Sequence, residues 1–200
     1  MFGGSRLTVA LAFQVAVVVV AVGLAWLFGL APWERLQWSA PALGWSVTAT
    51  LPLLAMLLVF PVARWQWARE ISRIVEQVVL PLFNRAPAGS VLLVALLAGV
   101  GEELLFRGVV QDGLAGLFGP VTGLILASLL FGLAHAVTPA YFIIASLLGA
   151  YLGWLYVHSG NLLIPIIVHA LYDWIAIHFY LWNRKRGTRR SGDSGLKRDN

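Results

Sequence analysis

Six stretches of about 20 mostly apolar residues follow one another along this chain of 200 residues. An α-helix of about 20 residues crosses a hydrocarbon layer of about 30 Å. Because no water satisfies backbone polar groups in lipid, such stretches cross the membrane as helices. The sequence therefore predicts an all-α, polytopic membrane bundle with spans at 7–30, 43–63, 90–111, 121–138, 140–158 and 161–182.

Charged residues are scarce, and many of them lie in one short segment. They make up 12% of the chain, and the mean hydropathy is +0.82, which excludes an ordinary soluble domain. Residues 183–200 hold seven Lys or Arg and two Asp, which accounts for the whole net charge of +5. The basicity thus does not indicate a nucleic-acid surface, and the expected partners are the lipid bilayer and a membrane protein or peptide. We expect residues 1–182 to form a single transmembrane domain and residues 183–200 a disordered tail.

Residues 64–85 separate the second and third spans and have a different pattern. Apolar side chains recur there at helical spacing, with charged residues on another face, which predicts an amphipathic helix on the membrane surface. The segment carries four Arg and two Glu, whereas residues 31–42 carry one of each. The positive-inside rule then places both termini in the cytoplasm. The short chain without further domains looks prokaryotic, which predicts a prokaryotic cytoplasmic membrane. The apolar face consists of Ile71, Ile74, Val75, Val78 and Leu82.

Six ionisable side chains remain well inside the predicted spans, where a charge costs about 2.5 kcal/mol or more. Residues four apart share one face of a helix, so each of three spans carries a polar stripe. At ~1.5 Å per residue, Glu102 lies ~18 Å from the cytoplasmic end of the third span. His135 and His169 lie ~21 Å and ~12 Å from the opposite ends of the fourth and sixth spans. We therefore expect the stripes to meet in a small polar cavity near the middle of the membrane. The six are Glu102, Glu103, Arg107, His135, His169 and Asp173.

These residue types together are suited to hydrolysis. A glutamate can take a proton from water while a histidine positions or shares that proton. A second imidazole can donate to the oxyanion of a tetrahedral intermediate. The cluster therefore predicts cleavage of an amide or ester within the membrane. Arg107 either neutralises Glu103, as a structural ion pair within one helix, or binds a substrate carboxylate.

Other hydrolytic designs were compared by their motifs. The sequence has no H-E-x-x-H, no G-x-S-x-G and no second aspartate motif beside "YD" at 172–173. Ser128 lies two turns before His135, which leaves a serine nucleophile as a minor alternative. We expect no cofactor to be required. A divalent metal such as zinc in an open site on Glu102, His135 and His169 stays as an alternative.

Three ordered motifs carry a family resemblance. "EELLFR", "FGLAH" and "HALYD" resemble the motifs E-E-x-x-x-R, F-x-x-x-H and H-x-x-x-N/D of the CAAX prenyl endopeptidase-like family, also called CPBP or Abi proteins. The resemblance covers residues 90–178 and implies a glutamate-dependent intramembrane endopeptidase, or CAAX protease. It also implies that Glu102 is the general base and that His135 activates the water. His169 and Asp173 would form the oxyanion site. The supporting motif residues would be Glu103, Arg107 and Phe131.

The last motif position departs from the eukaryotic type, which has Asn where this chain has Asp173. An ionised aspartate cannot donate a hydrogen bond, so Asp173 either carries a proton or orients His169. The main rival to an enzyme is a non-catalytic membrane protein. An immunity factor, a scaffold or a transporter would use the same polar cluster for binding or for helix packing.

Overall fold

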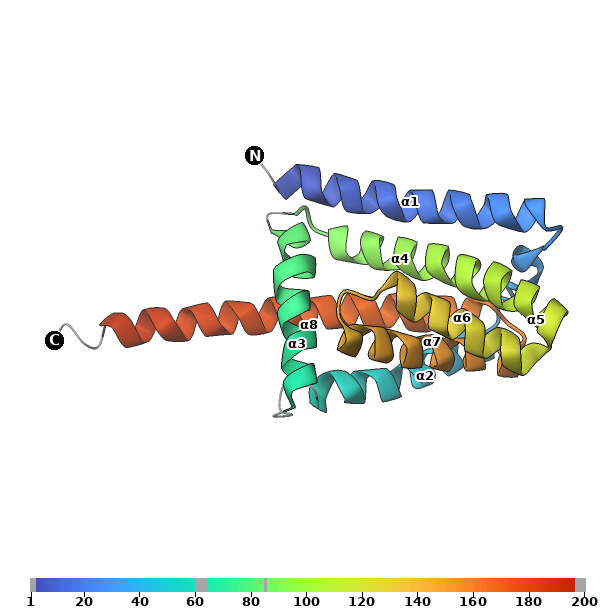
Figure 1. Ribbon diagram of the computed structural model, residues 1–200. Helices are drawn as coiled ribbons and strands as arrows, with labels where there is room; N and C mark the ends of the chain where they lie inside the picture. The colour runs from blue at the N-terminus through green and yellow to red at the C-terminus, as the bar shows by residue number, and fades with distance from the viewer. Residues whose placement is uncertain (1–2, 60–64, 85, 197–200) are drawn as a thin grey trace.

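Long helices that run side by side make up most of the structure, as Figure 1 shows. This computed structural model describes residues 3–59, 65–84 and 86–196, and within these ranges it contains helices and no strands. The all-α prediction is therefore confirmed. The elements are α1 (Gly3–Leu27), η1 (Pro32–Arg35), α2 (Ala40–Val59), α3 (Gln66–Ile74), η2 (Val75–Val79), η3 (Leu80–Phe83), α4 (Ser90–Glu103), η4 (Leu104–Gln111), α5 (Asp112–Phe118), α6 (Pro120–Ala134), α7 (Pro139–Ser159) and α8 (Leu163–Leu196).

Four of the described helices are long and apolar enough to cross a membrane, which agrees with an integral membrane protein. They cover residues 6–27, 40–59, 139–159 and 163–184. The predicted count of six is not confirmed. The fourth predicted span is the shorter apolar helix α6, of 15 residues. The third is divided between α4 and the π-helical η4, because the helix changes its hydrogen-bond register after Glu103, and α5 continues beyond the predicted span.

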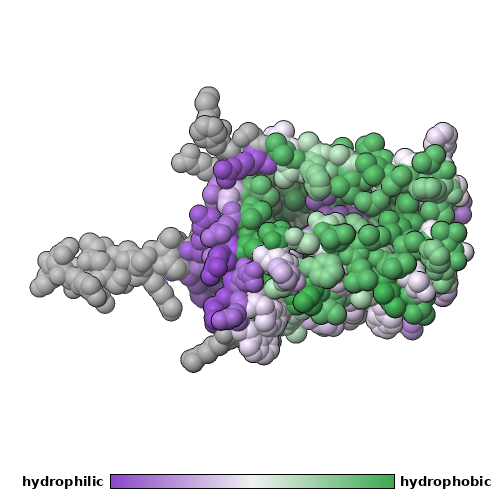
Figure 2. All heavy atoms as spheres, viewed as in Figure 1, coloured by the Kyte–Doolittle hydropathy of each residue, from purple (hydrophilic) through white to green (hydrophobic). Residues whose placement is uncertain are grey.

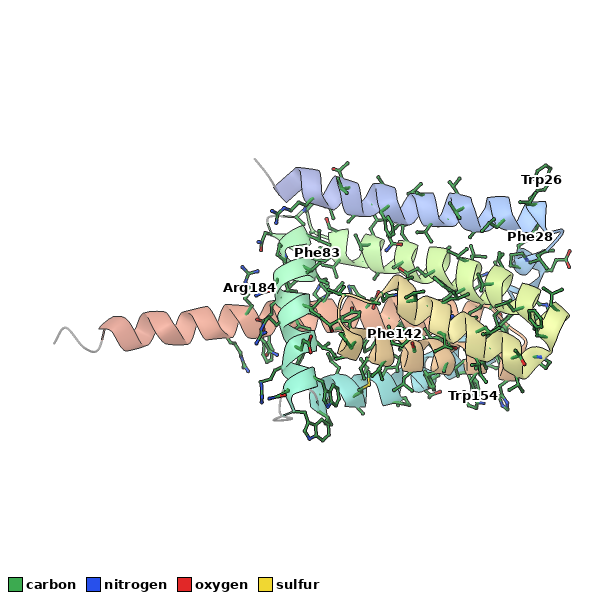
Figure 3. All side chains as sticks on the ribbon, in the orientation of Figure 1. Trp26, Phe28, Phe83, Phe142, Trp154 and Arg184 are labelled. Carbon is green, nitrogen blue, oxygen red and sulfur yellow. The ribbon has the colours of Figure 1, made fainter. Side chains whose placement is uncertain are left out.

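The outer surface has the polarity of a membrane protein. On the face seen in Figure 2, a belt of hydrophobic residues covers the bundle, and hydrophilic residues gather at the end that α3 crosses. Trp26 and Trp154, labelled in Figure 3, are 81% and 47% exposed on this belt. Aromatic side chains so exposed would be costly in water but are favourable against lipid.

The amphipathic segment crosses one end of the bundle, nearly perpendicular to the other helices (Figure 1). It comprises α3, the π-helical η2 and the 3-10 helix η3. Residues 64 and 85 of the predicted helix lie outside the described residues. The prediction was wrong for Val78, which is 55% exposed. The π-helical turn of η2 changes the residue spacing, so that Val79 lines the interior cavity and Leu80, the first residue of η3, is buried.

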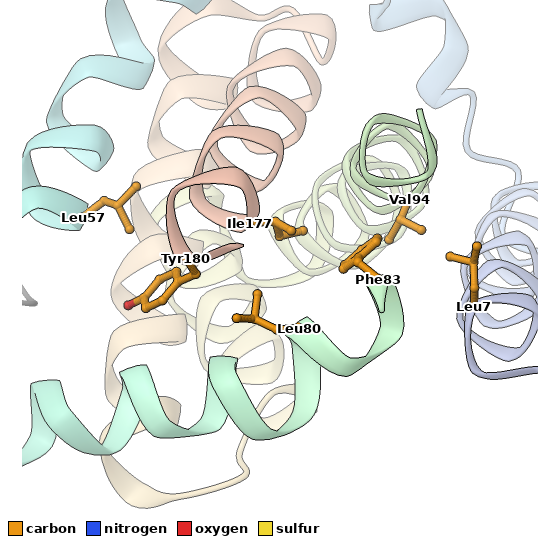
Figure 4. Packing of buried hydrophobic residues seen from close by; sticks show 7 residues of the cluster. All are labelled: Leu7, Leu57, Leu80, Phe83, Val94, Ile177 and Tyr180. Atoms are coloured by element: carbon orange, nitrogen blue, oxygen red, sulfur yellow. The ribbon is translucent and has the colours of Figure 1, made fainter. Parts of the chain in front are cut away.

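An apolar cluster fixes this crossing segment to the bundle (Figure 4). Leu80 and Phe83 of η3 are buried against side chains from four other helices. Burying a side chain of this size stabilises the fold by about 1.5–3 kcal/mol relative to its exposure to water. The cluster therefore holds the amphipathic segment across the ends of α1, α2, α4 and α8. Its other members are Leu7, Leu57, Val94, Ile177 and Tyr180.

Small residues allow α6 and α7 to pack closely, as expected from the four-residue spacing of Ala145, Gly149 and Gly153. A Cβ atom at Gly149 would lie 3.3 Å from the Phe131 ring. Ala145 is buried in one cluster with the same Phe131. This contact holds α6 at the distance from which Phe131 and His135 reach the polar cluster.

Candidate active site

Glu102 lies at the centre of the polar side chains from three helices. Its Oε2 is 3.4 Å from Nε2 of His135, at the end of α6, and 3.9 Å from Nε2 of His169 on α8. Glu102 is only 8% exposed. Its Oε2 has no hydrogen-bond partner within the described part of the chain. A buried acceptor that faces two imidazoles at these distances is placed to hold a small polar molecule between them.

His135 follows the last residue of α6 and is fixed by its own helix. Its Nδ1 is 2.8 Å from the carbonyl oxygen of Phe131, and its ring stacks on the Phe131 ring at 4.4 Å. A carbonyl oxygen can only accept, so Nδ1 carries the hydrogen. In the neutral ring, Nε2 is therefore a free acceptor directed toward Glu102. The His135 side chain is 31% exposed, whereas the His169 side chain is 5% exposed, so His135 is the more accessible of the two imidazoles.

His169 is held from the other side by the second glutamate. Its Nδ1 is 2.8 Å from Oε1 of Glu103, and its Nε2 is 3.6 Å from Oδ2 of Asp173. Because the carboxylate of Glu103 accepts, Nδ1 carries a hydrogen. His169 can then donate through Nε2 only as an imidazolium ion. The three carboxylates around the ring favour that charged form.

Glu103 and Arg107 lie behind this cluster. Arg107 Nε is 3.0 Å from Glu103 Oε2, and both side chains are fully buried. The guanidinium also lies 5.0 Å from the centre of the Phe131 ring. Neither Glu103 nor Arg107 lines the cavity described next. This placement agrees with the structural ion pair and not with binding of a substrate carboxylate.

A cavity of about 280 Å³ adjoins the polar cluster. Its polar end includes Glu102, His135, His169 and Asp173, and Asp173 is 33% exposed. The other end is apolar and extends beneath the amphipathic segment. Hydrophilic residues are visible within the hydrophobic belt in Figure 2. The apolar lining comes from eight elements and includes Leu57, Ile71, Val75, Val79, Leu82 and Val94.

Gln14 and Tyr141 are among the cavity residues that were not predicted from the sequence. Gln14 of α1 donates through Nε2 to Oε1 of Glu102 at 3.4 Å. Tyr141, in the first turn of α7, lines the cavity and packs on the cluster around Phe131. Gln14 carries the only amide in the apolar window 7–30, and that isolated polar group was the available signal.

The serine and metal alternatives were compared with this geometry. The Ser128 hydroxyl donates to the carbonyl oxygen of Leu124 at 2.6 Å, so it bonds to its own helix. Across the residues described, no group of three or more His, Asp or Glu side chains is arranged to hold a metal ion.

Comparison with known proteins bears on the same region. No curated protein and no solved structure matches the chain significantly. Residues 84–175 match the family model described as type II CAAX prenyl endopeptidase Rce1-like. This match spans all three motifs and confirms the resemblance that they predicted. Residues 84–175 of this membrane protein are therefore similar to the type II CAAX prenyl endopeptidase Rce1-like family.

Proposed function

We propose that the protein is an intramembrane endopeptidase that cleaves a peptide bond near a membrane-embedded or lipidated segment. The observation that carries the proposal is the convergence of Glu102, His135 and His169 at one buried carboxylate oxygen. The Rce1-like match supports a CAAX-type, protease-like function for the domain that contains them. Glu102, His135, His169 and Asp173 are the proposed catalytic residues.

The first chemical step follows from two acceptors that face each other. Glu102 Oε2 and the free Nε2 of His135 can each accept one hydrogen of a single water molecule. The water oxygen then directs a lone pair toward the scissile carbonyl carbon. As the new C–O bond forms, Glu102 takes the proton, and it later returns that proton to the leaving amine when the C–N bond breaks.

The oxyanion formed in this step needs donors on its other side. His169 in its imidazolium form donates through Nε2, since Glu103 already accepts the Nδ1 hydrogen. Asp173, 3.6 Å from that Nε2, completes the same side of the cavity. Glu103 and Arg107 position His169, and Phe131 positions His135 through ring stacking and its carbonyl oxygen.

The proposed topology places the reaction inside a lipid bilayer. In addition to the four long helices, α6 and the continuous stretch α4–η4–α5 would cross, giving six spans. Both termini and the basic segment 183–200 would face the cytoplasm of a prokaryote, with the amphipathic segment on that surface. The expected partners are a membrane protein or peptide and the lipid bilayer, without nucleic acid. The division into a domain at 1–182 and a tail at 183–200 stays a prediction.

The non-catalytic alternative is less well supported. Helix packing would explain a buried pair such as Glu103 and Arg107, but it does not require two further imidazoles beside a cavity. A scaffold or transporter would also retain its effect when a buried glutamate becomes a glutamine of the same shape.

The decisive experiment compares native protein termini in membranes of cells that express the wild type or Glu102→Gln at equal abundance. The proposal expects new termini, next to membrane-embedded or lipidated segments, in the wild type alone. Identical termini in both membranes, together with any retained phenotype, would contradict it and favour the non-catalytic alternative.

The role of Asp173 is tested by Asp173→Asn. We expect the variant to retain at least about one third of wild-type turnover, because Glu103 still holds His169 and an amide N–H can donate to the oxyanion. The rate at which wild-type-specific termini appear in isolated membranes measures this. A complete loss of turnover would instead show that an ionised carboxylate at position 173 must orient His169 or keep it in the imidazolium form. Asp173→Leu, which lacks both properties, is the matched negative control.

We also propose that the reaction needs no metal. Elemental analysis of detergent-purified protein should find no zinc or other transition metal at a stoichiometric level, because Glu102 and His135 alone can activate the water in the proposed step. A stoichiometric metal that disappears in His135→Ala would overturn this version of the mechanism.

A further inference from the structure

The first helix contributes one polar side chain to the proposed catalytic centre, although it lies outside the Rce1-like domain. The buried or half-buried positions of α1 recur every three or four residues and form one stripe that faces α4 and η4. Gln14 lies in the middle of this stripe. The stripe contains Leu7, Leu11, Gln14, Val18, Ala21 and Ala25.

Close helix packing brings that stripe to Glu102. A Cβ atom at Gly101 would lie 3.0 Å from Val18 and 3.4 Å from the carbonyl oxygen of Gln14. The absent side chain at Gly101 therefore lets α1 approach α4 beside Glu102. At this approach the Gln14 amide donates to Oε1 of Glu102, and Gln14 itself lines the catalytic cavity.

The two oxygens of Glu102 consequently have different partners. Oε1 accepts from Gln14, whereas Oε2 faces the imidazoles of His135 and His169. A carboxylate that is free to rotate would present either oxygen to the water. A donor on Oε1 fixes which oxygen does so and restricts the rotation of the group.

We infer that Gln14 is a positioning residue, which orients the Glu102 carboxylate so that Oε2 acts on the water. The inference rests on the proposed endopeptidase function. The structural rival is that Gln14 only fixes the register of α1 on α4, as a polar residue in an apolar helix seam can do. The two roles differ, because register depends on packing and stability, whereas orientation depends on a hydrogen-bond donor.

The experiment uses two variants of Gln14 and one matched control. Gln14→Met keeps the length of the side chain and removes the donor, and Gln14→His restores an N–H donor of similar reach. Gln111→Met is the control, because Gln111 is also a buried glutamine, and its amide donates to the Gly153 carbonyl oxygen at 3.2 Å outside the cavity. Each protein is measured for thermal stability in detergent and for the rate at which Glu102-dependent termini form in membranes.

We expect Gln14→Met to slow the formation of these termini by about 10-fold to 100-fold, as for loss of a hydrogen bond to a charged group. Gln14→His should recover most of the rate, and Gln111→Met should lower stability without a comparable loss of rate. Equal losses in Gln14→Met and Gln111→Met at matched stability, or no recovery in Gln14→His, would overturn the inference.

A spectroscopic measurement separates this inference from the proposed function. The infrared difference between wild type and Glu102→Gln isolates the carboxylate band of Glu102. Gln14→Met should shift that band, and Gln111→Met should leave it in place. If the wild type produces no Glu102-dependent termini but the band shifts, the endopeptidase proposal fails and the contact with Gln14 stands. If the termini form and neither rate nor band responds to Gln14→Met, the inference alone fails.

Discussion

Replacing Glu102 by glutamine is expected to lower the rate of peptide cleavage by about 10²-fold to 10⁴-fold, the usual contribution of a general base. Glutamine keeps the size of the side chain and can still accept the hydrogen bond from Gln14. It cannot take a proton from water at Oε2, which is the oxygen that faces both imidazoles. The rate of formation of wild-type-specific termini, in membranes with equal amounts of protein, measures the effect.

The variant should remain folded, since it removes a buried negative charge without leaving a cavity. Its melting temperature in detergent should equal or exceed that of the wild type. Glu76→Gln is the matched control, because Glu76 is an exposed glutamate on η2. A Glu102→Gln protein that cleaves at the rate of Glu76→Gln would exclude Glu102 as the base.

Replacing Arg107 by methionine is expected to destabilise the protein by about 3–5 kcal/mol, as measured for broken buried ion pairs. The methionine fills much of the same space, but it removes the guanidinium partner of the fully buried Glu103 carboxylate and leaves only His169 beside it. It also removes the guanidinium that lies over the Phe131 ring. The free energy of unfolding, measured in mixed detergent micelles, gives the loss of stability.

The origin of that loss can be separated with a second substitution. Adding Glu103→Gln to Arg107→Met removes the stranded charge and should recover a large part of the lost stability. Arg73→Met, at an exposed position of α3, is the matched control and should change stability little. Equal stability of Arg107→Met and Arg73→Met would show that the buried pair does not contribute as proposed.

The sequence allowed the helical architecture and the composition of the polar cluster to be predicted, because both depend on spacing within single helices. Glu103 and Arg107 are four residues apart and do form an ion pair. Phe131 and His135 have the same spacing, and their rings stack. Their roles in catalysis stay predictions until the variants above are measured.

Other features could not be predicted, because they depend on how helices rotate against one another or change register. Gln14 contacts Glu102 only through the close approach of α1 to Gly101. The π-helical segments η2 and η4 alter the residue spacing, so Val78 is exposed and the third span is divided. Regular periodicity cannot reveal such a change of register, since it assumes one helix type throughout.

The short length of α6 has a consequence for the lipid around the protein. Its 15 residues extend only ~22 Å, less than the ~30 Å hydrocarbon thickness of a typical bilayer. In the proposed topology α6 crosses the membrane, and this mismatch would favour local thinning of the bilayer. His135 lies directly after the last residue of this helix. Thinning there would bring headgroups and bulk water nearer to His135, so bilayer thickness would control how readily water is supplied to the reaction.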